Sequence, residues 1–292
     1  MNGDHMVGQM YVTHYQQAAP RSKLPVLLWH GGGLSGASWE DRPDGGPGWL
    51  DYFLRAHYDV LVSDAFERGR SGWPAYPQVL PDAPEHRSLD SIWHHFRFGP
   101  EGGYPGNDIE KLAVAHAHEG QQFPVEHLEQ FGRQFVPRWV ATQQQALAAY
   151  EALLRRVGPC VVIGHSQGAA YALECARRFP ELIEAVVAVE PPNAPNATNA
   201  PATSPDSSAA RALPPHLFIW GDFIDERAPN WQEYRAQVER YHLALHEAGT
   251  RSEFLDLPRI GIHGNSHLLI MDRNNQDIAK LVEQRLQAMV NN

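Results

Sequence analysis

Six short runs of hydrophobic residues recur along the chain, and turn-forming residues bound each of them. They lie at residues 25–30, 58–64, 160–164, 185–190, 216–222 and 252–258. Such runs, rich in Val, Ile and Leu and without polar alternation, are typical of strands buried on both faces of a sheet. The pattern therefore predicts six strands of a largely parallel sheet.

Stretches with helical spacing of apolar residues separate these runs. They cover residues 140–157, 167–178, 231–248 and 276–289. In the last stretch, Ile278, Val282, Leu286 and Met289 recur at intervals of three and four residues, as on one face of a helix. Strands that alternate with helices predict an α/β fold with a doubly wound, mostly parallel sheet. We expect residues 1–292 to form a single domain.

Residues 77–139 interrupt this alternation. Pro and Gly are frequent there, no strand-like run is visible, and eight aromatic residues occur, among them Trp93, Phe96 and Phe98. We expect an inserted lid that covers a binding site and uses these aromatic side chains to select an apolar group. A small packed subdomain without a role in binding is the alternative.

The segment Gly164-His165-Ser166-Gln167-Gly168 follows a predicted strand and opens a predicted helix. In this context G-x-S-x-G forms a nucleophile elbow, a turn so tight that only small residues fit two positions before and after the serine. The serine oxygen then lies at a helix N-terminus, where free N–H groups favour negative charge. Ser166 is therefore the candidate nucleophile.

A glycine-rich loop, His30-Gly31-Gly32-Gly33, directly follows the first predicted buried strand. Loops of this kind supply backbone N–H groups that bind the oxyanion of a tetrahedral intermediate. We expect the N–H groups of Gly32 and Gln167 to form this oxyanion hole. A phosphate-binding loop is disfavoured, because the spacing fits neither G-x-G-x-x-G nor the P-loop with its lysine.

A nucleophilic serine needs a histidine as its base and a carboxylate that orients the histidine. His263 and His267 both precede the last predicted helix, and His267, immediately before an apolar stretch, is the expected base. For the acid, Asp225 follows the strand after which this fold most often places it, while Glu190 ends the preceding strand; Asp222 is a weaker candidate. The residues alone leave this choice open.

Composition limits the partners. The 292 residues carry a net charge of −10 and only three lysines, which argues against nucleic acid or an anionic membrane as the main partner. No run of 18 apolar residues exists, and the first ten residues do not resemble a signal peptide, so we expect a cytoplasmic protein. The proposed chemistry requires no metal and no cofactor.

Seven segments together resemble a small group of bacterial serine esterases of the α/β-hydrolase superfamily. In order, they are HGGGLSGASWEDRPDGGPGWLDYFL, RGRSGW, FRFGP, QFPV, GHSQG, VEPP and GIHGNSHLLIMDRNN. The resemblance implies that Glu190, after the sixth strand of that fold, is the acid and that His267 is the base. Gly32 and Gly33 stand where a member of that group has adjacent cysteines, and the loop after Glu190 is longer here.

The expected function is that of a serine carboxylic-ester hydrolase with an acyl-enzyme intermediate. Lactone hydrolysis uses the same groups, so the expected partner is a small-molecule ester or lactone. A non-catalytic binding protein of the same fold is the alternative from another class, and a homodimer is compatible with the sequence.

Overall fold

The computed structural model describes residues 4, 6–74, 77–196, 212–225 and 228–290. Seven strands form one sheet in the order β1-β3-β2-β4-β5-β6-β7, in which β1 is antiparallel to β3 and all other neighbours are parallel. The strands are β1 (Tyr11–Tyr15), β2 (Val26–Trp29), β3 (Val60–Asp64), β4 (Cys160–His165), β5 (Ile183–Val189), β6 (His216–Trp220) and β7 (Ser252–Asp256).

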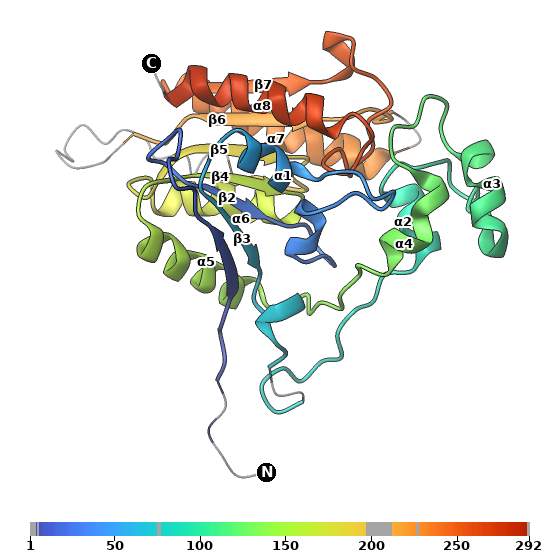
Figure 1. Ribbon diagram of the computed structural model, residues 1–292, viewed down its shortest axis with the longest axis horizontal. Coiled ribbons are helices and arrows are strands. Elements are labelled where there is room, and N and C mark those ends of the chain that lie inside the picture. Colours follow the sequence, from blue (N-terminus) through green and yellow to red (C-terminus); the bar gives the residue numbers. More distant parts are fainter. Residues whose placement is uncertain (1–3, 5, 75–76, 197–211, 226–227, 291–292) are drawn as a thin grey trace.

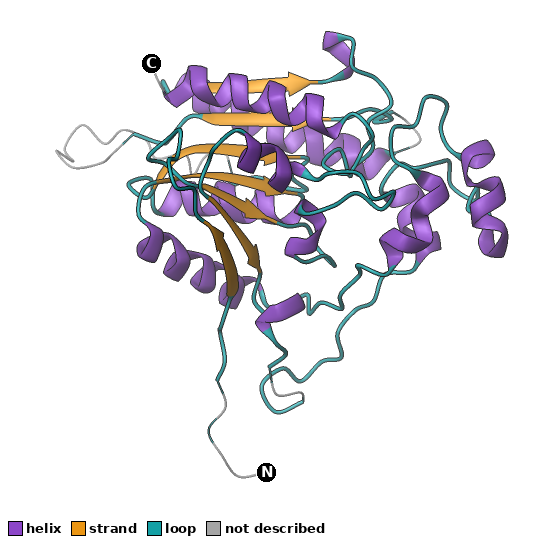
Figure 2. Cartoon of the chain, in the orientation of Figure 1, coloured by secondary structure: helices purple, strands orange, loops and turns teal. Residues whose placement is uncertain are grey.

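Helices cover both faces of this sheet (Figures 1 and 2). The α-helices are α1 (Trp49–Arg55), α2 (Leu89–His95), α3 (Ile109–His116), α4 (Leu128–Gly132), α5 (Gln143–Val157), α6 (Gln167–Arg178), α7 (Pro229–Glu247) and α8 (Asn275–Val290). Side chains of α1 and α8 belong to one hydrophobic cluster, and those of α5, α6 and α7 to a second cluster on the other face.

The two clusters lie on opposite faces of the sheet, and successive residues of a strand belong to them in turn. In β2, Val26 and Leu28 belong to the first cluster, and Leu27 and Trp29 belong to the second, because successive side chains of a strand point to opposite faces. A strand with helices on both sides needs apolar residues at every position. The predicted doubly wound α/β fold is confirmed, and all six predicted strands are present.

The segment 77–139 contains α2, α3 and α4 and packs beside the ends of the strands (Figure 1). The backbone N–H of His267 donates to the carbonyl of Phe96 at 3.0 Å, and that of Gln122 donates to the carbonyl of Gly264 at 2.8 Å. These bonds attach the segment to the loop before α8. Of the longer loop noted after Glu190, residues 197–211 lie outside the described residues.

Candidate active site

Ser166 lies in the turn between β4 and α6. Its backbone has φ 51° and ψ −119°, an unfavourable conformation for a residue with a side chain, and its N–H donates to the carbonyl of Val189 at 2.8 Å. A Cβ atom on Gly164 would lie 2.6 Å from the Ala169 backbone, and one on Gly168 would lie 2.3 Å from the carbonyl oxygen of Trp29. The two glycines therefore permit the close approach that the predicted elbow requires.

The glycine-rich loop after β2 lies beside this elbow. A Cβ atom on Gly31 would lie 3.2 Å from the Ser166 Cβ, and one on Gly32 would lie 3.3 Å from Oε1 of Gln167. Gln167 is the first residue of α6, and the first N–H groups of a helix have no partner within it. Gly32, Ser166 and Gln167 thus line one cavity.

His30 holds the glycine-rich loop. Its Nε2 accepts a hydrogen bond from the Ala65 N–H at 2.9 Å, so Nδ1 carries the proton and donates to the Gly31 carbonyl at 2.8 Å. Burial lowers the pKa of His30 to about 4. The neutral ring therefore persists at neutral pH and fixes the backbone next to Gly32.

His267 and Glu190 form a buried pair. Nδ1 of His267 lies 3.0 Å from Oε2 of Glu190, and the two side chains are 1% and 0% exposed. Because a carboxylate only accepts hydrogen bonds, Nδ1 is the donor, and Nε2 of the neutral ring is left with a free electron pair. This is the protonation state that a general base requires.

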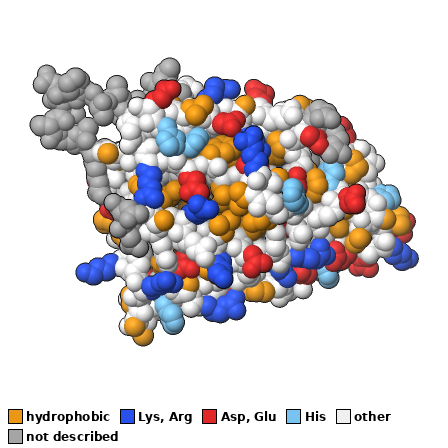
Figure 3. All heavy atoms as spheres, turned by 90° about the horizontal axis from the view of Figure 1, so that it is seen from above, with side chains coloured by type: hydrophobic (Ala, Val, Ile, Leu, Met, Phe, Trp, Pro, Cys, Tyr) orange, Lys and Arg blue, Asp and Glu red, His pale blue; other side chains and the backbone are white. Residues whose placement is uncertain are grey.

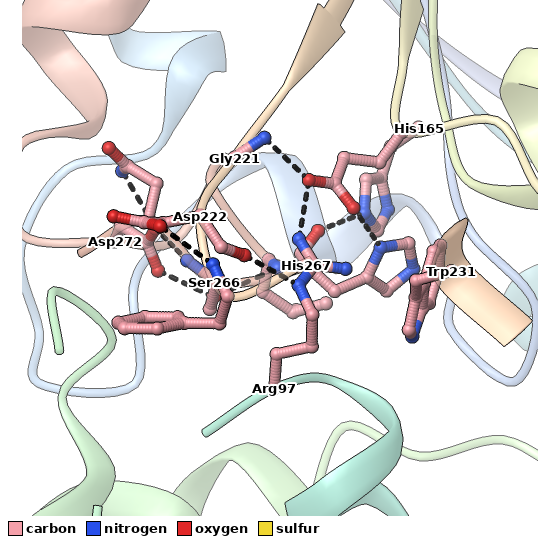
Figure 4. Close-up of polar contacts among 12 residues, drawn as sticks. Arg97, His165, Gly221, Asp222, Trp231, Ser266, His267 and Asp272 are labelled. Atoms are coloured by element: carbon pink, nitrogen blue, oxygen red, sulfur yellow. Dashed lines mark hydrogen bonds and ion pairs between the residues drawn. The ribbon is translucent and has the colours of Figure 1, made fainter. Parts of the chain in front are cut away.

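The second oxygen of Glu190 has two further donors. Oε1 accepts from the Gly221 N–H at 2.7 Å and from Nη2 of Arg97 at 2.6 Å. Arg97 is 1% exposed, and its Nε donates to the carbonyl of Asp222 at 2.8 Å. Figure 4 shows Arg97 reaching between His267 and Asp222. Sequence reasoning did not identify Arg97; the FRFGP segment was its only signal.

Aromatic rings surround His267. The ring centroids of Trp231, His165 and Phe96 lie 4.2, 4.8 and 5.1 Å from that of His267. Nε2 of His165, the neighbour of Ser166, donates to the His267 carbonyl at 2.8 Å. Burial, together with the nearby charges of Arg97 and Arg87, lowers the pKa of His267 well below its usual value.

The loop that carries His267 is fixed by Asp272. This buried carboxylate accepts hydrogen bonds from the Ser266 N–H, the Ser266 hydroxyl and the Asn265 amide at 2.8, 2.7 and 2.8 Å. Burial raises the pKa of Asp272 to about 6 in spite of these donors. The three bonds hold the backbone next to His267.

The remaining candidate residues lie around this pair. Asp222 accepts a hydrogen bond from the Gly264 N–H at 2.9 Å and lies 3.4 Å from Nδ1 of His263, whose side chain is 66% exposed. His263 therefore faces solvent. Asp225 follows β6 by five residues, and its carbonyl accepts from the Ala228 N–H at 2.9 Å.

A cavity of about 350 Å³ opens beside Ser166. Segment 77–139 contributes Arg87, His95 and Arg138 to its lining. The described lining contains none of the predicted aromatic selectors, Trp93, Phe96 and Phe98. All three are buried in the first hydrophobic cluster. The expectation that these rings contact substrate was therefore wrong: they pack against one another, and charged side chains face the cavity.

The hydrogen bonds of the described residues include none between Ser166 Oγ and His267. The structure nevertheless brings the elbow, the glycine-rich loop and the His267–Glu190 pair to the same edge of the sheet. In the described part of the chain, no three His, Cys, Asp or Glu side chains are grouped as metal ligands. No described helix is long and apolar enough to cross a membrane.

Comparisons with known proteins agree with this fold. The chain is 28% identical to a fungal protein (Fungal sp., strain ATCC 74256) named "Probable secreted lipase phiG", over 94% of this chain and 84% of the relative. It is similar to a solved bacterial esterase with 31% identity and a TM-score of 0.82, over 97% of this chain and 86% of the other.

A more distant structure is that of the putative non-heme bromoperoxidase BpoC from Mycobacterium tuberculosis. It has 14% identity and a TM-score of 0.52, covers 99% of both chains, and shares the fold alone. The model of the alpha/beta hydrolase family matches residues 26–291, which is most of the chain. The chain belongs to the alpha/beta hydrolase family.

Proposed function

We propose that the protein is a serine hydrolase that cleaves carboxylic esters through an acyl-enzyme. The main support is the buried His267–Glu190 pair next to the strained turn of Ser166, with Nδ1 and Oε2 3.0 Å apart. The similarity to a bacterial esterase and to a fungal lipase favours the same class of reaction.

In the proposed reaction, Ser166 Oγ attacks the ester carbonyl while its proton passes to Nε2 of His267. The oxyanion that forms accepts hydrogen bonds from the N–H groups of Gly32 and Gln167. When the C–O bond breaks, His267 returns the proton to the leaving alcohol, and water then repeats these steps on the acyl-enzyme. Lactones are cyclic esters, so the same steps apply to them.

Glu190 is the proposed acid of the triad. Its carboxylate orients His267 and stabilises the imidazolium that forms as the proton arrives. Asp225, the alternative from fold position, has no assigned role in this proposal. Arg97 holds the Glu190 carboxylate from its far side and is a positioning residue.

The function is tested with Ser166→Ala. The wild-type protein should hydrolyse 4-nitrophenyl acetate without added metal, and the variant should lose almost all of this rate, because removal of a triad serine costs on the order of 10⁶ in turnover in a serine protease. The measurement is release of 4-nitrophenol by folded protein, checked by circular dichroism. A variant that retains more than about a tenth of the rate contradicts the assignment.

A further inference from the structure

Two arginines, Arg87 and Arg138, lie against the glycine-rich loop that contains Gly32. A Cβ atom on Gly32 would lie 3.5 Å from Nη1 of Arg138, and one on Gly33 would lie 3.4 Å from Nε of Arg87. Both arginines line the cavity that contains Ser166. Two guanidinium groups therefore border the place where the substrate carbonyl would lie.

The described lining of this cavity contains basic side chains and no acidic side chain. Among the described residues that line it, Arg87 and Arg138 are the charged side chains at neutral pH, and none is Asp or Glu. Burial first, and nearby Arg87 and Arg97 next, lower the pKa of His95 to about 4, so this third basic residue of the lining is neutral. The described lining of the cavity thus carries a positive charge, in a protein of net charge −10.

Arg87 has unused hydrogen-bonding capacity. Its Nε is buried without a hydrogen-bond partner, and no ion pair within the described residues includes it. Its guanidinium instead lies over the Phe96 ring, 5.4 Å from the centroid. The side chain of Arg87 donates no hydrogen bond within the described residues, so its guanidinium has donors left for an acceptor bound in the cavity that it lines.

Arg138 is only partly compensated. Nη2 lies 3.2 Å from Glu85, a side chain that is 57% exposed, and ion pairs of this kind contribute little. The charges that face Arg87 are Arg138 and Arg68, which oppose its protonation, and Glu85, which favours it; burial and this repulsion lower the pKa of Arg87. Arg68 has a buried acidic partner, Glu67. Within the described residues, Arg87 and Arg138 have no such partner, and both line the cavity.

We propose that Arg87 and Arg138 form a carboxylate-binding subsite beside Ser166, and that the preferred substrates are small esters that carry a free carboxylate. The inference rests on the proposed function. A guanidinium presents donors in a planar fork that matches a carboxylate, and hydrogen bonds between charged groups are stronger than those between neutral groups. A cavity of about 350 Å³ holds a small substrate of this kind.

The test compares pairs of esters that differ in charge and hardly in shape. Monoethyl succinate and ethyl succinamate place a carboxylate or its amide on the acyl side, and acetoxyacetate and acetoxyacetamide place it on the alcohol side. In at least one pair, the wild-type protein should prefer the acid by about tenfold or more in kcat/KM. Succinate, unlike succinamide, should inhibit hydrolysis of the neutral esters competitively.

Variants connect the preference with the two arginines. Arg87→Gln and Arg138→Gln should bring the acid-to-amide ratio of kcat/KM close to one, whereas Arg87→Lys should retain a preference for the acid. Arg133→Gln is the matched control, because Arg133 is exposed in the same segment and, within the described residues, its side chain bonds only to Gln130, at 2.9 Å. A ratio within one protein is independent of how much of that protein is folded.

Three outcomes would overturn this inference, and only the last would also overturn the proposed function. The first outcome is Ser166-dependent hydrolysis of neutral esters with no preference for either acid and no inhibition by succinate. This result would overturn the subsite and leave the proposed function intact. A preference that survives both Gln variants would also overturn it. If no ester of either kind is hydrolysed through Ser166, the proposed function fails and the subsite with it.

Discussion

One oxygen of the Glu190 carboxylate accepts from the guanidinium of Arg97, and the other accepts from the neutral imidazole of His267. Arg97 and His267 are both almost completely buried, so neither interaction is weakened by water. The arginine compensates the buried charge, and it also opposes the effect by which Glu190 would raise the pKa of His267. The balance leaves His267 neutral over a wide range of pH.

Replacing Arg97 tests this balance. Arg97→Met should raise the pKa of His267, because Glu190 is then uncompensated, and the acidic limb of kcat/KM should move to higher pH. Arg97→Lys should keep the wild-type profile. In the wild type this limb should lie below pH 6.5, since the pKa of His267 is lowered. The measurement is kcat/KM against pH on protein shown to be folded.

Loss of the ion pair should also lower the free energy of unfolding of Arg97→Met, by about 3–5 kcal/mol. If Arg97→Met merely lowers the rate at every pH without moving the acidic limb, Arg97 has only a structural role. Arg97 could not be found from its spacing, because its partners Glu190 and Asp222 are brought near it only by the tertiary fold.

At the scale of elements, aromatic side chains of the segment 77–139 pack against one another within the first hydrophobic cluster. Phe98 stacks on Phe123 with centroids 4.1 Å apart, and Phe131 and Trp93 meet Phe98 edge on. The ring of Phe96 also contacts His267 at 5.1 Å. The composition of the segment revealed that aromatic residues gather there, but it could not reveal which of them face the core and which face a cavity.

Phe98→Ala should therefore destabilise the protein and leave its relative rates on short-chain and long-chain esters unchanged. Truncation of a buried phenylalanine costs about 3–5 kcal/mol, and Phe98 is 0% exposed. The measurement is a urea unfolding curve, with the exposed Val114→Ala in the same segment as the control. A shift in the relative rates of short and long esters without loss of stability would restore Phe98 as a contact to substrate.

The central strands could be predicted because they are runs of hydrophobic residues, and the helices between them because their apolar residues recur at helical spacing. β4 and α6 were located within about a residue of their observed ends, together with the elbow between them. The edge strand β1 was missed, since its residues Tyr11–Tyr15 are partly exposed and show no continuous apolar run. Helix α1 was missed because seven residues are too few for a clear period.

At the scale of the whole molecule, many charged side chains lie at the surface (Figure 3), whereas several histidines are buried. Acidic and basic side chains are interspersed on the face shown in Figure 3. Several histidines, in contrast, are inside: burial lowers the pKa of His30, His165 and His216 to about 4 in each case. The unfolded chain, in which histidine titrates near its usual 6.5, binds more protons between these two values.

The free energy of unfolding should therefore fall as pH decreases from about 6.5 to about 4, by about 1.4 kcal/mol per pH unit for each histidine that titrates only in the unfolded chain. Asp272 acts in the opposite direction, since its raised pKa of about 6 favours the folded state as pH falls toward 3.8. One carboxyl does not offset three histidines.

Urea unfolding at pH 7.5, 6 and 5 measures this slope. His216→Phe, on β6 and remote from Ser166 in the fold, should reduce the slope by the share of one histidine. Equal stability at pH 7.5 and 5 would contradict the assignment of neutral, buried histidines.

The central claim is that Ser166 is a nucleophile activated by the His267–Glu190 pair. The most direct measurement is the rate at which a fluorophosphonate labels the protein, with the modified residue identified by peptide mass spectrometry. We expect one adduct, on Ser166, and labelling slowed by orders of magnitude in Glu190→Gln, because in a serine protease the corresponding change costs roughly 10⁴ in turnover. Asp225→Asn should slow it less than about tenfold. An adduct on another residue, or the reverse ranking of the two variants in folded protein, would contradict the account.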